Sequence, residues 1–251
     1  MVHFVGAGPG ATDLITVRGQ NLLKEADVII YAGSLVNKEH LNLAKEGCGI
    51  YNSASMTLEE VIDVIKKAEQ EGKMTVRLHT GDPSIYGAIR EQMDRLNELH
   101  IAYDVVPGVS SFCGAAAALK AEYTLPDVSQ TVIITRMAGR TPVPEKEEIS
   151  LLAAHQATMA IFLSTGLLKP LRERLLIGGY REDTPAAIVY KATWPEEQVF
   201  YGTVGTLPEI AEKNNITKTA LILVGDFLGD AYERSKLYDP SFAHEFREAS
   251  K

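Results

Sequence analysis

VHFVGAGPGATD, residues 2–13, is the stretch around which the rest of the chain is organised. Its short apolar run predicts a buried parallel strand, and its three glycines predict a tight turn before a helix that begins near Thr16. Strand, glycine turn and helix in this order are typical of a ligand site at the carboxyl edge of a sheet, because glycine lets the backbone approach a ligand closely. Pro9 removes an N–H donor from the turn, which argues against a phosphate cradle.

The same stretch also fits two other interpretations. Gly6, Gly8 and Ala11 formally satisfy the dinucleotide-binding fingerprint, which further requires an acidic residue about 20 residues on. The strand expected at 27–31 is followed by Ala32 and Gly33 instead, so no carboxylate stands where a ribose would need one. A nicotinamide-dependent oxidoreductase and a purely structural turn are therefore kept as alternatives.

Composition restricts the class of protein. The 251 residues carry a net charge of −8, which argues against a nucleic-acid partner, since such proteins normally present a basic face. Cys48 and Cys113 lack metal-type spacing, so we expect neither a metal site nor a disulfide framework, and a reducing cytoplasm fits best. Neither a signal peptide nor an apolar run of the roughly 20 residues that cross a bilayer is found, so no membrane partner is expected.

Two further strands are predicted to end in turns of similar build. The strands expected at 74–78 and 103–106 lead into HTGDPSIYG (79–87) and PGVSS (107–111). Because strands and helices alternate, we expect a parallel α/β sheet whose carboxyl edge brings the three turns together. Between them, Thr57 and Glu60 form a capping box that predicts a helix over 58–70, and Ser34 or Asn37 is expected to cap an earlier helix.

The pattern breaks near 121–126, where we place a domain boundary. We expect an N-terminal α/β domain over 1–120, a C-terminal α/β domain over 121–235 and a tail over 236–251. In the second domain, the segments 185–190 and 197–201 predict an antiparallel hairpin among strands that otherwise alternate with helices. The first sheet is therefore expected to be mainly parallel and the second mixed.

Read together, the strand-end turns resemble the tetrapyrrole (corrin and porphyrin) methyltransferase family. The matching segments are 5–10 with 14–16, 81–83, 106–111, 185–189 and 223–225, in the family's order. Within the family, the segments 31–36, 79–87 and 135–142 are similar to the branch that methylates precorrin-4, with or without cobalt, at carbon 11. Relatives that methylate uroporphyrinogen carry an aspartate after the second strand and a lysine after the third. This chain has Ala32 or Gly33 and Asn52 or Ser53 there, which disfavours that reaction.

The resemblance implies S-adenosylmethionine (SAM) as methyl donor, S-adenosylhomocysteine as product and a carboxylate-rich tetrapyrrole as substrate. It also implies a homodimer in which the active-site cleft lies between the two α/β domains of each chain. Carried over by motif position, the donor-binding residues are Pro9, Gly81, Asp82, Pro83, Ile85, Ser110, Ser111, Leu163, Ala192 and Ala220.

Methyl transfer from a sulfonium to carbon needs little covalent help, since positioning alone can supply roughly 7–11 kcal/mol. Arg136, together with Arg140, is the candidate for binding the substrate's carboxylates. His79 could orient the substrate or move a proton, with a merely hydrogen-bonded histidine as the alternative. Cys113 is expected to be a small buried apolar group, and Trp194 a packing residue. A non-catalytic tetrapyrrole-binding protein is the alternative from another functional class.

Overall fold

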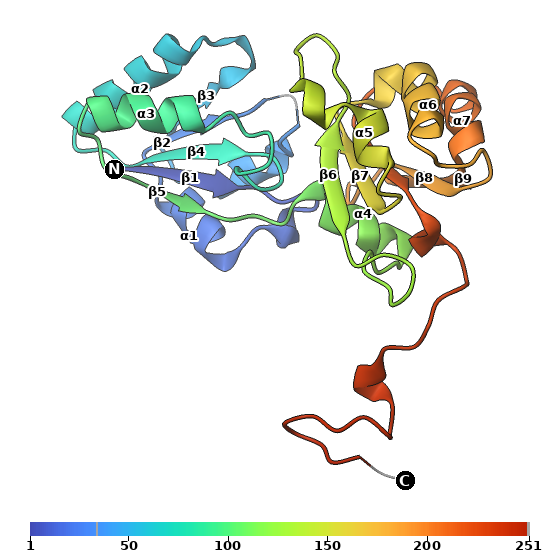
Figure 1. Ribbon diagram of the computed structural model, residues 1–251. Helices are drawn as coiled ribbons and strands as arrows, with labels where there is room; N and C mark the ends of the chain where they lie inside the picture. Colours follow the sequence, from blue (N-terminus) through green and yellow to red (C-terminus); the bar gives the residue numbers. More distant parts are fainter. Residues whose placement is uncertain (34, 250–251) are drawn as a thin grey trace. The chain divides into compact units, whose positions relative to one another are not determined.

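The computed structural model describes residues 1–33 and 35–249, and the chain forms two compact units, each built on its own five-stranded sheet (Figure 1). The first unit comprises Met1–Gly114 together with Lys191–Glu196, and the second comprises Ala115–Tyr190 together with the chain from Glu197 onward. Within the described ranges, none of the helices combines the length and the apolar character that crossing a bilayer requires.

The first sheet is entirely parallel, with strand order β3-β2-β4-β1-β5. Its strands are β1 (Val2–Gly6), β2 (Val28–Tyr31), β3 (Gly49–Asn52), β4 (Thr75–His79) and β5 (Tyr103–Val106). Because β1 lies between β4 and β5 and all three run in the same direction, their glycine turns are neighbours at one edge. This confirms the expectation that the three turns share the carboxyl edge of one sheet.

Helices cover both faces of this sheet, α1 (Val17–Glu25) on one face and α2 (Leu58–Gln70) with α3 (Arg90–Glu98) on the other (Figure 1). The predicted capping box is present: Thr57 Oγ1 accepts a hydrogen bond from the Glu60 amide, and the Thr57 amide donates to Glu60 Oε2 at 2.7 Å. Asn37 caps the short 3₁₀ helix η2 (Lys38–Leu43) through a single bond, which its Oδ1 accepts from the Glu39 amide, whereas Ser34, the alternative cap, lies outside the described residues.

The second sheet is mixed, as expected, with strand order β6-β7-β10-β8-β9. β6 and β7 are parallel, whereas β10 is antiparallel to both of its neighbours. The predicted hairpin is confirmed, because β8 and β9 pair antiparallel over their whole lengths. The elements of this part of the chain are α4 (Ser111–Leu119), β6 (Val132–Arg136), α5 (Ile149–Ala153), β7 (Thr158–Phe162), α6 (Leu168–Ile177), β8 (Pro185–Tyr190), β9 (Gln198–Thr203), α7 (Leu207–Lys213) and β10 (Ala220–Val224).

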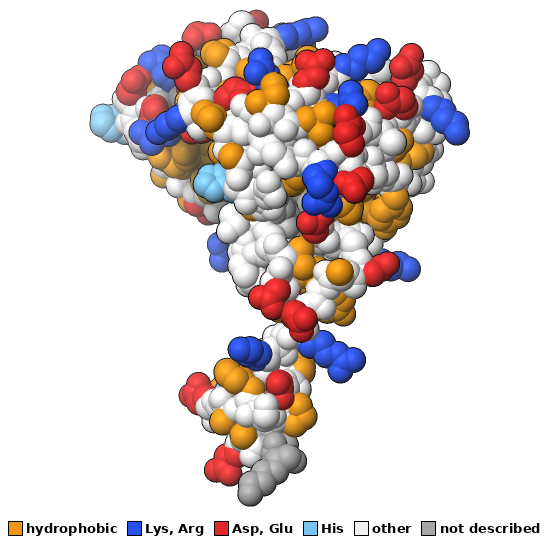
Figure 2. Space-filling model, turned by 45° about the vertical axis from the view of Figure 1, so that its right-hand side comes forward, with side chains coloured by type: hydrophobic (Ala, Val, Ile, Leu, Met, Phe, Trp, Pro, Cys, Tyr) orange, Lys and Arg blue, Asp and Glu red, His pale blue; other side chains and the backbone are white. Residues whose placement is uncertain are grey.

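One prediction of burial is wrong. The Cys113 thiol is exposed, because α4 turns Ala115 and Leu119 inward and leaves Cys113 on another side of the helix. The C-terminal segment also exposes large apolar side chains, Tyr238 and Phe246 among them. Figure 2 shows several hydrophobic side chains in orange on the segment in the lower part of the view, and acidic, basic and hydrophobic side chains interspersed over the rest of the visible face.

Candidate functional site

The three glycine turns of the first unit are joined by direct hydrogen bonds. The Gly81 amide donates to the Gly8 carbonyl at 2.8 Å, and the Gly8 amide donates back to the Gly81 carbonyl at 3.3 Å. Asp82 then links the second turn to the third, since its Oδ2 accepts a hydrogen bond from the Gly108 amide at 2.8 Å. The turns after β1, β4 and β5 therefore form one connected unit at the sheet edge.

This unit has no room for side chains at its centre. A Cβ built on Gly6 would lie 2.6 Å from both the Gly108 Cα and the Gly81 carbonyl oxygen. Gly8 and Gly81 adopt φ of +80° and +59°, in the left-handed region that glycine enters without steric cost. The glycines are thus required by the close backbone contact between the turns.

Asp82 is held by three donors from two turns. Its Oδ1 accepts hydrogen bonds from the Ser84 amide at 2.8 Å and from the Ser84 hydroxyl, and its Oδ2 accepts the bond from Gly108. Burial raises the pKa of this carboxyl, but the bonds from Ser84 and Gly108 outweigh that effect and bring the pKa below its ordinary value. Asp82 is consequently ionised, and its carboxylate links the turn after β4 to the turn after β5.

The turn after β4 is also anchored from beneath. Arg77 is buried in β4, where its Nε donates to Gln92 Oε1 at 2.9 Å. Gln92 in turn donates from Nε2 to the Ala88 carbonyl at 2.9 Å. Ala88 and Tyr86 both have positive φ, and a Cβ on Gly87 would run into the Pro83 carbonyl. Such strained backbone persists only where surrounding contacts determine it, and it gathers at functional sites.

His79, a candidate for substrate orientation, lies inside the first unit. His79 is only 3% exposed, and the centroid of its ring lies 6.1 Å from that of the Phe4 ring. Within the described residues, its Nε2 has no hydrogen-bond partner. Burial, and secondarily the charge of Arg77, lowers the pKa of His79 to about 3. The imidazole is therefore neutral at physiological pH.

A pH-dependent stability follows from this buried imidazole. Below the ordinary pKa of about 6.5, His79 binds a proton in the unfolded chain but not in the folded chain. The free energy of unfolding therefore falls as the pH drops from this value towards the pKa of the folded state. Between pH 7.5 and pH 5.5, this effect of His79 should lower the free energy of unfolding of the wild type by about 1.4 kcal/mol. Urea unfolding of His79→Gln should show a pH dependence smaller by that amount. Parallel profiles for the two proteins would contradict the assignment.

The remaining predicted donor residues fall into two groups. Pro9, Gly81, Pro83 and Ser110 are buried at the joined turns, with Asp82, Ile85 and Ser111 half-buried beside them, and Ala192 is buried in the first unit's segment Lys191–Glu196. Leu163 and Ala220 belong to the second unit, each two residues beyond the last pair of β7 with β10, Ile161↔Ile222. Leu163 is 63% exposed with φ of +52°, an unusual conformation for leucine.

Arg136 lies at the end of β6 in the second unit. Its Nη2 donates to the Pro142 carbonyl at 2.6 Å, and its Nη1 donates to the Thr141 carbonyl at 3.2 Å. The guanidinium thus organises the loop that follows its own strand. Arg140, on this loop, is exposed.

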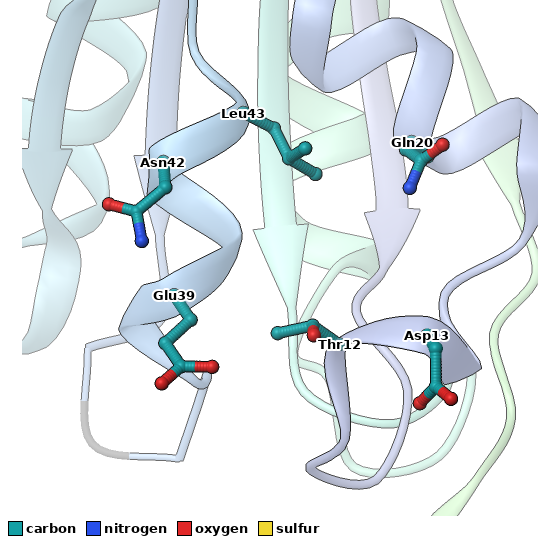
Figure 3. A pocket seen from close by; sticks show the side chains of 6 residues that line it. All are labelled: Thr12, Asp13, Gln20, Glu39, Asn42 and Leu43. Carbon is teal, nitrogen blue, oxygen red and sulfur yellow. The ribbon is translucent and has the colours of Figure 1, made fainter.

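A hollow of about 330 Å³ lies beside the glycine turn of the first unit (Figure 3). It is lined by Thr12, Asp13, Gln20, Glu39, Asn42 and Leu43, none of which belongs to the predicted site. Its two ionisable groups, Asp13 and Glu39, are both acidic, so it does not suit a substrate fringed with carboxylates. The joined turns therefore stand as the better candidate site.

Three side chains that the sequence did not single out for the site contact the turn over residues 7–11. The Pro9 carbonyl accepts a bond from Trp194 Nε1, the Gly10 carbonyl accepts one from Asn37 Nδ2, and the Ala11 amide donates to Thr193 Oγ1. Separations of 27 to 185 residues explain why local patterns could not reveal them. The lone tryptophan was the only signal available.

These bonds leave few peptide groups for a ligand. The Ala7 amide donates to the His79 carbonyl at 2.7 Å, and Gly8 exchanges both bonds with Gly81. Among the described residues of this turn, the Gly10 amide alone keeps an N–H without such a partner, since Pro9 has none. A phosphate cradle needs several free N–H groups, so the turn is unsuited to the pyrophosphate of a dinucleotide.

Comparisons with known proteins give matches over nearly the whole chain. The family profile described as Tetrapyrrole (Corrin/Porphyrin) Methylases matches residues 1–208. The cobalt-precorrin-4 C(11)-methyltransferase of Methanocaldococcus jannaschii is 55% identical over 251 residues, which cover 100% of this chain and 97% of the relative.

Two solved structures share the fold. The X-ray structure of a cobalamin biosynthetic enzyme, cobalt precorrin-4 methyltransferase, has a TM-score of 0.89 and 48% identity, covering 91% of this chain and 96% of the other. Uroporphyrin-III C-methyltransferase from Thermus thermophilus, complexed with S-adenyl homocysteine, has a TM-score of 0.75 and 25% identity, covering 90% and 92%. The two-sheet architecture is therefore shared with methyltransferases, one of which holds the spent donor.

Proposed function

The chain belongs to the tetrapyrrole (corrin/porphyrin) methylase family, and on that premise we propose that it methylates carbon 11 of cobalt-precorrin-4 or precorrin-4 in cobalamin biosynthesis. The observation that carries the proposal is the full-length likeness to the cobalt-precorrin-4 C(11)-methyltransferase. The residues after the second and third strands also support it, because Ala32 or Gly33 and Asn52 or Ser53 stand where the uroporphyrinogen enzymes carry an aspartate and a lysine. A Cβ on Gly33 would in addition displace the Asn52 side chain.

SAM is the donor, and the joined turns fit it. A Cβ on Gly6 or Gly108 would meet the backbone of a neighbouring turn, so the turns pack closely together, and the amides of Ala7, Gly8 and Ala11 are already used within the protein. Such a surface holds a ligand by shape and close backbone approach. We assign the donor to Pro9, Gly81, Asp82, Pro83, Ile85, Ser110 and Ser111, with Leu163, Ala192 and Ala220 as further contacts.

When bound, SAM supplies an electrophilic methyl group: an electron-rich ring carbon attacks it, the carbon–sulfur bond breaks, and S-adenosylhomocysteine leaves with the electron pair. The protein's part is to hold both reactants in line, which can supply roughly 7–11 kcal/mol. Arg136 and Arg140 bind substrate carboxylates with the N–H groups that the loop after β6 does not use. His79, neutral and buried, shapes the sheet edge beneath the turns. The proposal includes a homodimer in the cytoplasm.

The test is transfer of a labelled methyl group. Incubation with SAM carrying a carbon-13 methyl and with cobalt-precorrin-4 or precorrin-4 should give one new methyl group, which NMR of the product should place at carbon 11. Calorimetric titration should show heat with S-adenosylhomocysteine and none with NAD(P). Label at another ring carbon would point to a sister methyltransferase. Tetrapyrrole binding without transfer would indicate the non-catalytic binding protein, and heat with NAD(P) alone the oxidoreductase.

A further inference from the structure

Three polar side chains fix the orientation of successive peptide groups in the glycine turn. Asn37 Nδ2 donates to the Gly10 carbonyl at 2.9 Å, Trp194 Nε1 donates to the Pro9 carbonyl at 3.0 Å, and Thr193 Oγ1 accepts from the Ala11 amide at 3.0 Å. We propose that Asn37, Thr193 and Trp194 are positioning residues for SAM, which act through the turn. The inference rests on the proposed function, because it takes this turn as part of the donor site.

Asn37 is locked in one orientation. Its Oδ1 accepts a hydrogen bond from the Glu39 amide at 3.0 Å, as the cap of η2, which leaves its Nδ2 to face the Gly10 carbonyl. The amide group therefore cannot turn over without breaking both bonds. Through Asn37, the position of η2 is transmitted directly to the turn.

Trp194 is held by two neighbours, Gly10 and Lys191. One side of its indole packs on Gly10, where a Cβ would lie 2.8 Å from the Trp194 Cγ and closer still to the pyrrole edge of the ring. The Lys191 Nζ lies 5.5 Å from the ring centroid, and Lys191 also pairs with Glu196 at 3.3 Å. These contacts restrict the rotation of the indole, so its N–H stays directed at the Pro9 carbonyl.

The segment that carries these residues has a strained backbone. Lys191 and Thr193 have φ of +47° and +69°, and a β-branched residue rarely adopts this conformation. Strain of this kind is retained where the surrounding contacts over-determine it. Since Gly10 and Pro9 are buried, a rotation of their peptide groups would move the Pro9 ring, and a displacement of about 1 Å can cost a catalytic site on the order of 100-fold.

Thr193 allows an isosteric test. Thr193→Val keeps the shape, including the methyl group that faces Gly114, but removes the acceptor of the Ala11 amide, whereas Thr193→Ser keeps the acceptor. Asn37→Asp keeps the cap of η2 and replaces the donor to Gly10 by a carboxylate oxygen, which repels the Gly10 carbonyl. Asn214→Asp is the matched control, because Asn214 Nδ2 donates to a backbone carbonyl, that of Ile210, in the second unit.

We expect Thr193→Val and Asn37→Asp to weaken S-adenosylhomocysteine binding by about tenfold in calorimetry, because each variant loses one partly buried hydrogen bond that positions the turn. The KM for SAM should rise in step, while the KM for the tetrapyrrole stays within about twofold. Thr193→Ser and Asn214→Asp should bind like the wild type. Because Trp194 is the only tryptophan, its fluorescence should shift to the red in both weakened variants and remain unchanged in Asn214→Asp.

Each other outcome overturns the inference in a recognisable way. Wild-type affinity in Thr193→Val and Asn37→Asp would show that the turn needs no positioning. Equal losses in Thr193→Val and Thr193→Ser, matched by equal falls in the urea midpoint, would show a general structural role. A wild type that binds no S-adenosylhomocysteine would instead remove the proposed donor site itself, which the variants alone could not do.

Discussion

Gly108→Ala is expected to abolish measurable binding of S-adenosylhomocysteine. A Cβ on Gly108 would lie 2.8 Å from the Gly6 Cα and closer still to the Gly81 carbonyl oxygen, so one of the three joined turns must move. Both obstacles are backbone atoms in buried turns, which cannot give way as the end of a flexible side chain can. We expect a loss of affinity of at least about 100-fold, as for a displacement near 1 Å, and a fall in the free energy of unfolding of about 1–3 kcal/mol.

Gly47→Ala is the matched control for this experiment. Gly47 has a positive φ of +78°, but a Cβ there would meet nothing within 4 Å. The substitution should therefore cost about 1 kcal/mol of stability through backbone strain and leave donor binding unchanged. Calorimetric titration with S-adenosylhomocysteine and urea unfolding of both variants give the comparison. Retained affinity in Gly108→Ala would refute the assignment of the donor to these turns.

Asp82→Ala is expected to weaken donor binding by more than about tenfold and to lower the free energy of unfolding by about 3 kcal/mol. The substitution leaves the Gly108 and Ser84 amides without the carboxylate that they both donate to, and hydrogen bonds to a charged group are worth about 1.5–3 kcal/mol each. The donor affinity and the stability of Asp82→Asn should lie between those of the wild type and of Asp82→Ala, because the single carbonyl oxygen of asparagine can accept from only one of the two amides.

Ser84→Ala separates the two bonds made by Asp82 Oδ1. It removes the hydroxyl donor but keeps the Ser84 amide and the link to Gly108, so affinity should fall by less than about threefold. An unchanged affinity in Asp82→Ala, measured by calorimetry, would mean that the backbone of the turns holds the donor without this side chain. A loss in Ser84→Ala equal to that in Asp82→Ala would instead make the hydroxyl the group that matters.

Much of the fold was predictable because it rests on local signals. The Thr57–Glu60 capping box gave the start of α2, and the glycines after β1, β4 and β5 marked the shared sheet edge. The hairpin of β8 and β9 followed from two apolar runs around a short turn. In each case the controlling interaction joins residues close in sequence, or repeats a pattern that parallel strands impose.

The rest depended on contacts that no short window contains. Asp82 was expected to contact the donor, and no local pattern indicated that its Oδ2 also accepts a hydrogen bond from Gly108, 26 residues away. The exposure of Cys113 was missed because an alanine-rich helix gives little indication of which side faces inward. The burial of His79 follows from its place in a strand covered on that face, a property of the finished sheet.

The return of Lys191–Glu196 to the first unit has a consequence for synthesis of the chain. When the ribosome has synthesised the chain as far as Gly114, all five strands of the first sheet have been made, but Thr193 and Trp194 have not. At about 5–20 residues per second the nascent protein waits several seconds before these side chains emerge. Throughout that interval the turn over residues 7–11 lacks the hydrogen bonds that join Trp194 to Pro9 and Thr193 to Ala11, so its peptide groups gain these partners only after the chain has been synthesised past Trp194.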